Sequence, residues 1–269
     1  MNLAQRGCPA CQENSSSVEY QSKDYAVVRC DQCDFVYLPV SAAFEHYVEG
    51  EGAWENSISA NTELRLKKMP LRTKLSLATR FRTKFKKKTP VSYLDRHFST
   101  TNQKRIDVLD IGCGDGAYLL SLEERFVPFG IEISKELARH AEALFSKRGG
   151  SVINAATTKA LFEFQGQSMD AVVMRSYLEH EAEPLEVLMG CANVLKKTGV
   201  VVIKVPNYDS INRRVMGANW CGFRFPDHVN YFTPDSLSKM ASLAGFRTVQ
   251  RFTDKLPTSD NMWAVLTPA

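Results

Sequence analysis

The chain has 269 residues, of which 44% are hydrophobic and 24% are charged. These values are typical of a globular protein with a sizeable core and exclude a disordered chain. The net charge of +4 is modest. There is no apolar run long enough to cross a membrane, and residues 1–7 lack the apolar core of a signal peptide, so we expect a cytoplasmic location.

Two CxxC pairs lie near the N-terminus, at Cys8 and Cys11 and at Cys30 and Cys33. In a reducing compartment this pattern favours a metal site over two disulfides, because four thiolates can bind zinc tetrahedrally. A redox-active dithiol pair is the alternative. Short strands are expected at 25–29 and 35–38. A site with four cysteine ligands has no open position, so we predict structural zinc in a ribbon spanning residues 1–40.

Residues 41–104 form a predicted helical connector. Residues 64–94 contain eleven lysines and arginines and no acidic residue. Apolar residues recur there at steps of three and four from Leu71 to Phe85, which predicts a basic amphipathic helix. The basic face of residues 65–88 has three open interpretations: a solvated surface, a contact with anionic membrane lipid, or a contact with nucleic acid.

A glycine-rich loop, Asp110-Ile-Gly-Cys-Gly-Asp-Gly116, follows a short apolar strand predicted at 106–109. A helix is predicted after the loop, at 117–124, because leucines recur there at helical spacing. Glycines at such a turn let backbone approach a ligand closely, and a helix N-terminus offers free N–H groups. The next predicted strand, 129–133, contains Glu132, an acid placed to accept hydrogen bonds from ribose hydroxyls.

The loop and the following Gly130-Ile-Glu132 resemble class I S-adenosylmethionine (SAM) dependent methyltransferases. Dehydrogenases have the spacing Gly-x-Gly-x-x-Gly instead. The resemblance implies a Rossmann-like α/β fold with a seven-stranded class I methyltransferase sheet over residues 105–269, and SAM as the cofactor. Many relatives have an acid where this chain has Asn154. The implied cofactor-binding residues are Asp110, Gly112, Cys113, Gly114, Gly116, Glu132, Ile133, Asn154, Arg175 and Ser176.

Further strands are predicted at 151–154, 169–174, 200–207, 246–252 and 262–266, and helices at 134–147 and from Thr233 to Gly245. The carboxyl ends of the strands form the ligand crevice of such a sheet, so residues 175–180 and 206–207 should border it. Residues 207–233 are rich in aromatic residues and breakers. They are predicted to form a lid or substrate platform, or alternatively a structural insert.

The N-terminal segment, from Cys30 to Pro39 and then from Phe44 to Tyr47, also resembles the zinc ribbon of some bacterial methyltransferases, of which sugar C-methyltransferases are the best known. Residues 227–232, Asp-His-Val-Asn-Tyr-Phe, are similar to their His-x-x-Tyr-Phe segment. This similarity implies His228 as the base and Tyr231 as its hydrogen-bond partner, although a structural histidine that caps the next helix is the alternative. His180, which follows a strand at the crevice, is a second candidate base.

The predicted reaction is O- or C-methylation of a small molecule, a sugar or a nucleotide- or lipid-linked sugar. Two alternatives remain open. One is an RNA methyltransferase that grips phosphates with the ribbon and the basic helix. The other is a non-catalytic SAM-binding scaffold. If the basic helix meets anionic lipid, the protein would be peripheral to the membrane.

Overall fold

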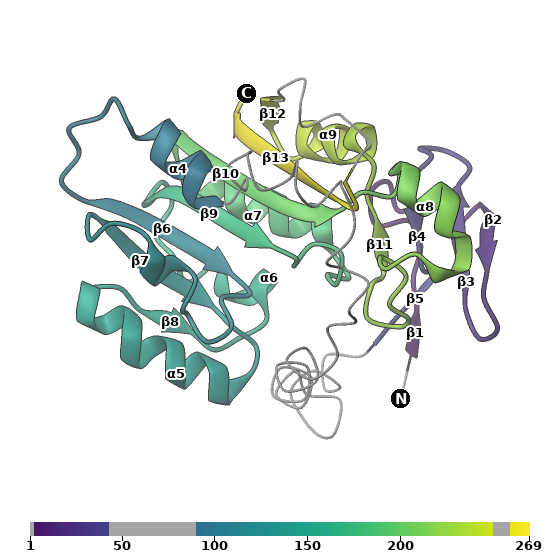
Figure 1. Cartoon of the computed structure of the whole chain (residues 1–269), viewed down its shortest axis with the longest axis horizontal. Helices are drawn as coiled ribbons and strands as arrows, with labels where there is room; N and C mark the ends of the chain where they lie inside the picture. Colours follow the sequence, from purple (N-terminus) through teal and green to yellow (C-terminus); the bar gives the residue numbers. More distant parts are fainter. Residues whose placement is uncertain (1–2, 43–89, 250–258) are drawn as a thin grey trace, which may run out of the picture.

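The computed structural model describes residues 3–42, 90–249 and 259–269. The predicted basic helix of residues 65–88, and most of the connector with it, lies outside these residues. Within them a sheet of seven strands forms one part of the molecule and a group of N-terminal strands the other (Figure 1).

The large sheet has the order β12-β13-β10-β9-β6-β7-β8. Strands β8, β7, β6, β9 and β10 are parallel, and β13 is antiparallel to both of its neighbours. Their bounds are β6 (Ile106–Ile111), β7 (Phe126–Ile131), β8 (Val152–Ile153), β9 (Met169–Arg175), β10 (Leu195–Pro206), β12 (Phe246–Val249) and β13 (Asn261–Pro268). Every strand predicted in this region is present, and the expected Rossmann-like seven-stranded fold is confirmed.

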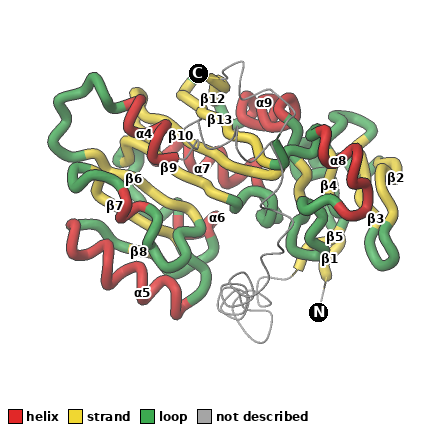
Figure 2. Tube along the Cα trace, in the orientation of Figure 1, coloured by secondary structure: helices red, strands yellow, loops and turns green. Residues whose placement is uncertain are grey.

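Helices cover both faces of this sheet (Figure 2). Alternate residues of β6 face two different cores: Val108 packs with the cluster that contains Phe145, and Leu109 packs with the cluster that contains Leu188. Both faces are therefore buried, which explains the nearly continuous apolar strands. The helices are α4 (Pro90–His97), α5 (Lys135–Phe145), α6 (Thr157–Ala160), α7 (Pro184–Val194), α8 (Ile211–Met216) and α9 (Pro234–Leu243). Among the described residues, no helix is both long and apolar enough to cross a bilayer.

Local sequence explains where two of these helices begin. The hydroxyl of Ser134 accepts a hydrogen bond from the Leu137 amide and caps α5, as its position predicts. Thr233 and Ser236 form a reciprocal capping box at the start of α9. These contacts satisfy amides that have no partner within the helix.

The helix predicted at 117–124 is wrong. Only a single 3₁₀ turn, Leu119–Ser121, follows the glycine loop. Leu119 and Leu122 are both buried, and the chain is extended at Leu122. A 3₁₀ turn aligns residues three positions apart, so it buries both leucines without a further helical turn. The loop is therefore not followed by an α-helix N-terminus.

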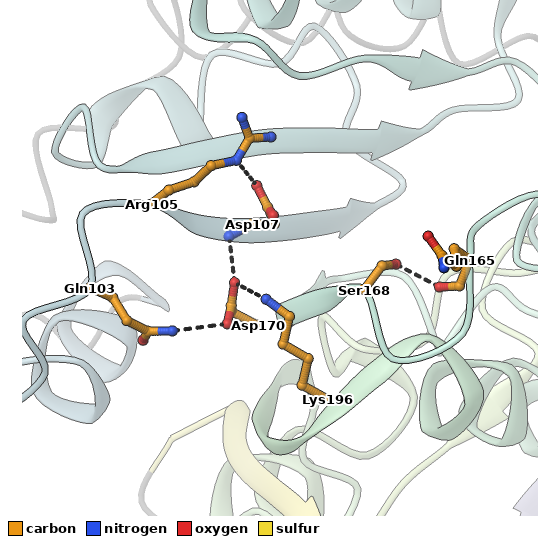
Figure 3. A network of polar contacts seen from close by, with 7 residues as sticks. All are labelled: Gln103, Arg105, Asp107, Gln165, Ser168, Asp170 and Lys196. Carbon is orange, nitrogen blue, oxygen red and sulfur yellow. Dashed lines mark hydrogen bonds and ion pairs between the residues drawn. The ribbon is translucent and has the colours of Figure 1, made fainter.

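A buried carboxylate ties the amino ends of three strands together (Figure 3). Asp170 is 3% exposed and accepts hydrogen bonds from the Asp107 amide at 2.9 Å, Lys196 Nζ at 2.8 Å and Gln103 Nε2 at 3.3 Å. These groups belong to β9, β6, β10 and the segment before β6. The network therefore holds together the amino ends of these strands, at the end of the sheet opposite the strands' carboxyl ends.

The N-terminal strands form two small sheets. One pairs β1 (Leu3–Gln5) with β5 (Val40–Ala42), and the other has the order β11-β4-β3-β2. The second contains β2 (Ser16–Gln21), β3 (Ala26–Cys30), β4 (Val36–Tyr37) and β11 (Asn230–Tyr231). The strands expected at 25–29 and 35–38 are confirmed. Strands β1, β2 and β5 were not predicted, because β2 lacks regular alternation and the other two have three residues each.

The segment 207–233 joins the N-terminal strands to the large sheet. Tyr231 of β11 pairs with Val36 of β4, and the buried rings of Tyr208 and Trp220 share a cluster with Val27. This packing is that of a structural insert, one of the two predicted alternatives. Asp227 and His228 of the insert also contact His180, in the segment that follows β9.

Candidate functional site

Three glycines in the loop after β6 have left-handed backbone, but only one faces open space. A Cβ on Gly112 would lie 2.7 Å from Tyr177, and one on Gly116 would lie 2.8 Å from Phe145. A Cβ on Gly114 would have no heavy atom within 4 Å. Gly112 and Gly116 thus serve close packing, whereas Gly114 leaves room for a ligand against the backbone.

Glu132 links this loop to the start of α5. Its Oε2 accepts the Gly114 amide at 2.8 Å, and its Oε1 accepts the Ser134 amide at 2.9 Å. Burial raises the pKa of the carboxyl, and the two amides partly oppose that rise. Each carboxylate oxygen has a second lone pair, so Glu132 can still accept bonds from a ribose.

The side chains of Asp110 and Cys113 are buried between the loop and the sheet. Asp110 is 3% exposed at the end of β6, and burial raises its pKa to about 7 while Arg175 partly opposes the rise. The side chain of Cys113 is buried, and its Sγ would lie 2.6 Å from a Cβ on Gly130. Cys113 therefore packs the loop against β7, and only its backbone lies in the loop itself.

Asn154 and Ile133 meet at the ends of β7 and β8. Asn154 Nδ2 donates to the carbonyls of Glu132 at 2.8 Å and Ile133 at 2.9 Å. The amide group thus holds the turn that contains Glu132, and Oδ1 is the atom of Asn154 that can accept a bond from a ligand.

Arg175 is the last residue of β9 and Ser176 follows it, and two residues that were not predicted, Tyr118 and Lys204, contact them. The Arg175 guanidinium lies 3.9 Å from the centroid of the Tyr118 ring. Ser176 has φ +57°, and its hydroxyl accepts a hydrogen bond from Lys204 Nζ at 3.0 Å. Burial lowers the pKa of Lys204. The signal for Lys204 was present in the sequence, as a lysine within the otherwise apolar run 200–205.

The insert is joined to the segment after β9 by hydrogen bonds to main-chain carbonyls of that segment. The amides of Val229 and Asn230 both donate to the Glu179 carbonyl, at 2.8 and 3.1 Å. Asn230 Nδ2 donates to the Leu178 carbonyl at 2.7 Å. These bonds place His228 beside residues that lie about fifty positions earlier in the chain.

Glu179, His180 and His228 consequently form one cluster. The two imidazoles are edge to face, with centroids 4.6 Å apart and an interplanar angle of 84°. His180 Nδ1 contacts the Asp227 carbonyl at 2.9 Å, and His228 Nδ1 contacts the Gly222 carbonyl at 2.8 Å. Glu179 is 1% exposed, and its Oε2 has no hydrogen-bond partner among the described residues.

Burial sets the charges in this cluster. It lowers the pKa of His180 to about 4 and that of His228 to about 3, with the neighbouring His180 adding to the effect on His228. It raises the pKa of Glu179 to about 8, while Lys204 and Arg224 partly oppose that rise. Both imidazoles are therefore neutral near pH 7, with the proton on Nδ1 because a carbonyl can only accept.

The hydroxyl of Tyr231 does not donate a hydrogen bond to the imidazole of His228. The hydroxyl donates to the main-chain carbonyl of His228 at 2.9 Å, and the side chain is 2% exposed. The ring packs against Tyr208 and Phe223. The structure thus brings Tyr231 and His228 together through the backbone.

The four cysteines predicted as metal ligands also meet. Cys8 and Cys33 have their sulfur atoms 3.5 Å apart, as do Cys11 and Cys30, and all four sulfurs lie within 4.8 Å of one another. Tetrahedral zinc with Zn–S bonds of about 2.3 Å places its sulfurs about 3.8 Å apart. The donor set and its spacing therefore fit a zinc ion.

Comparisons with known proteins agree with this architecture. The family described as "Methyltransferase domain" matches residues 82–251, well over half of the chain. A ubiquinone biosynthesis O-methyltransferase from Nitrosospira multiformis is 28% identical over 168 residues, which cover 58% of this chain and 67% of that protein. The protein of the same name from Dinoroseobacter shibae is 29% identical over 163 residues, covering 55% and 62%. The matched region thus spans only about two thirds of these relatives.

Two solved structures share the fold. A SAM-dependent methyltransferase from Clostridium acetobutylicum has a TM-score of 0.52 at 13% identity, covering 70% of this chain and 94% of its own. Magnesium protoporphyrin IX methyltransferase from Synechocystis, solved with bound SAH, has a TM-score of 0.51 at 13% identity, covering 67% and 82%. With the glycine loop, the acid after β7 and the strand order, the family match shows that the chain belongs to the methyltransferase-domain family and is a class I SAM-dependent methyltransferase.

Proposed function

We propose that the enzyme transfers the methyl group of SAM to an oxygen or carbon atom of a small hydroxylated acceptor, a sugar or a nucleotide- or lipid-linked sugar. One observation carries the proposal: two groups of polar residues lie at the carboxyl ends of neighbouring strands. The Gly114 loop and Glu132 follow β6 and β7, and the Glu179–His180–His228 cluster follows β9. The O-methyltransferase names of the relatives support a small-molecule acceptor.

The residues present fit SAM. Gly114 leaves open space beside the loop, and Glu132 has lone pairs for the ribose hydroxyls. SAM, when bound, supplies an electrophilic methyl group on a sulfonium, so the protein must mainly align the acceptor and exclude water. We assign the predicted cofactor-binding residues to this task, with Cys113 and Asn154 acting chiefly on the shape of the loop and of the turn after β7.

The acceptor must lose a proton, and we assign its removal to the histidine cluster. His228 is the proposed base. Its Nδ1–H bond to a carbonyl leaves the lone pair on Nε2, which can accept a proton. His180 has the same arrangement and is the second candidate. Tyr231 would act as a positioning residue, through its bond to the His228 carbonyl.

We also propose that Cys8, Cys11, Cys30 and Cys33 bind structural zinc. Their sulfur spacing supports this assignment, and four thiolates leave no position open for a substrate. The division into a ribbon (1–40), a connector (41–104) and a methyltransferase domain (105–269) remains part of this proposal. Pairing of β4 with β11 would transmit loss of zinc to the insert that contains His228.

The role of His228 can be tested with methyl transfer from radiolabelled SAM into a small-molecule cell extract. His228→Ala should reduce transfer at least a hundredfold while the Kd for SAM stays unchanged, because general-base catalysis contributes about 10²–10⁴-fold. His140→Ala is the matched control, since His140 is an exposed residue of α5 and should have no effect. Undiminished transfer by folded His228→Ala protein would remove His228 as the base.

A further inference from the structure

We propose that Glu179, His180 and His228 form a second metal site, distinct from the four cysteines, that binds a divalent transition-metal ion. Each of the three residues brings a ligand-type atom within 4.8 Å of the other two. They come from two segments that are held together by the main-chain bonds to the Glu179 carbonyl. The cluster is therefore a preformed set of one carboxylate and two imidazoles.

The hydrogen bonds of the two histidines leave them oriented as metal ligands usually are. Histidines that bind metals usually donate their other ring N–H to a carbonyl or carboxylate, which fixes both the tautomer and the ring orientation. His180 and His228 each have Nδ1 on a main-chain carbonyl, at 2.9 and 2.8 Å. Because a carbonyl can only accept, Nδ1 is the donor in each ring, and Nε2 is the ring nitrogen that carries a lone pair when the ring binds a metal.

Glu179 provides an independent indication of a ligand. Its side chain is almost completely buried, yet Oε2 has no hydrogen-bond partner among the described residues. Leaving a buried polar atom without a partner costs about 1–3 kcal/mol, and more for a charged group. A cation bound between Glu179 and the two imidazoles would satisfy this oxygen.

The ligand types select the class of ion. Two imidazoles and one carboxylate suit Zn²⁺ or Fe²⁺, whereas Mg²⁺ and Ca²⁺ prefer oxygen ligands alone. Three protein ligands also leave a coordination position open. The positive charges of Lys204 and Arg224 lie close enough to interact with Glu179, and they would repel a divalent cation bound there. This site should therefore bind zinc more weakly than the four cysteines do.

The open coordination position suggests a role for the ion in methyl transfer. This role rests on the proposed function. A hydroxyl oxygen of the acceptor would bind the ion and release its proton to solvent more readily, because a cation stabilises the oxyanion. The oxyanion would then form the new O–C bond as the C–S bond of SAM breaks. In the metal-loaded enzyme His228 would thus be a ligand, and the ion would take over the task assigned above to a free imidazole.

The proposal is tested by counting zinc ions in the full-length protein. Protein is dialysed against excess Zn²⁺, freed of loosely bound ion and assayed by elemental analysis. We expect two ions per chain in the wild type. Glu179→Gln and His228→Ala should each retain one, and Cys30→Ser should lose the cysteine-bound ion but keep the other. Glu183→Gln, an exposed acid in the same segment, should retain both.

Circular dichroism of each variant establishes that it is folded before ions are counted. A wild type that binds a single ion, lost only in Cys30→Ser, would overturn the proposal. So would a second ion that persists in both Glu179→Gln and His228→Ala. The count does not depend on turnover, so failure of the second metal site can be told apart from failure of the proposed methyl transfer.

Discussion

Replacing Gly114 and Gly116 separately by alanine should distinguish a glycine kept for the cofactor from one kept for packing. Both residues have left-handed backbone, with φ +57° and +76°. The strain of an L-residue in this region destabilises the folded state by about 1–2 kcal/mol. Alanine also lowers the conformational entropy of the unfolded chain, which offsets about 0.4–1 kcal/mol of this loss. Gly114→Ala meets nothing within 4 Å and should therefore lose about 1 kcal/mol of stability, and at most about 1.6 kcal/mol.

Gly116→Ala adds a steric cost to the same strain. Its Cβ would lie 2.8 Å from the Phe145 ring and 3.2 Å from the Cα of Ala141, which belongs to α5 and cannot move alone. Overpacking of this kind costs a further 1–3 kcal/mol or so, for a total of about 1–5 kcal/mol. At about 2–4 °C per kcal/mol for a domain of this size, Tm should fall by roughly 2–18 °C.

Thermal unfolding and calorimetric titration with SAM measure the two effects. Gly114→Ala should keep nearly the wild-type Tm and lose SAM affinity, because the new methyl group occupies the space beside the loop. Gly116→Ala should lose stability. The reasoning is refuted if Gly114→Ala binds SAM as tightly as the wild type, or if the two variants are equally stable.

Three further predictions concern other parts of the molecule. Burial raises the folded-state pKa of Asp110 from 3.8 to about 7, so the native state binds the proton more tightly and this group lowers stability as pH rises from about 4 to 7. Relative to the wild type, Asp110→Asn should therefore become more stable as pH rises through that window, by at most about 4 kcal/mol in the free energy of unfolding, as measured by denaturant titration of the SAM-free protein. If the unfolding free energies of the two proteins have the same pH dependence, this prediction is wrong. Arg6 donates to the carbonyls of Leu38, Ala182 and Val229, at 3.1, 2.9 and 3.2 Å. Arg6→Ala should therefore cost about 2–4 kcal/mol and expose the N-terminal strands to limited proteolysis, since it leaves these acceptors without their charged donor; wild-type resistance to protease would show that these bonds contribute little. Cys30→Ser should release zinc and lower Tm, and an equal Tm for zinc-loaded and zinc-free wild type would show that the ion is not structural.

The seven-stranded sheet was predictable because its signals are local. Apolar runs such as 200–203 and 171–174 identify strands buried on both faces, and Ser134 and Thr233 mark helix starts. The error at 117–124 has a local cause too. Leucines three residues apart suit a 3₁₀ turn as well as an α-helix, and only the packed structure distinguishes them.

The cluster around His228 was only partly predictable, because it depends on contacts between distant segments. His180 and His228 could each be picked out from a motif, but their proximity results from the docking of residues 229–230 on Glu179. Nothing local marks Glu179 as the third member. The pairing of β11 with β4, which joins Tyr231 to Val36, is likewise invisible to periodicity.

The central claim is methyl transfer to a small molecule, and the most direct test is transfer from radiolabelled SAM into a fractionated cell extract. We predict label in the soluble small-molecule or lipid fraction, dependent on intact Glu132 and His228. Label confined to RNA would contradict the proposed acceptor. Absence of label from every fraction, with SAM still bound to the protein, would contradict catalysis and favour a SAM-binding scaffold.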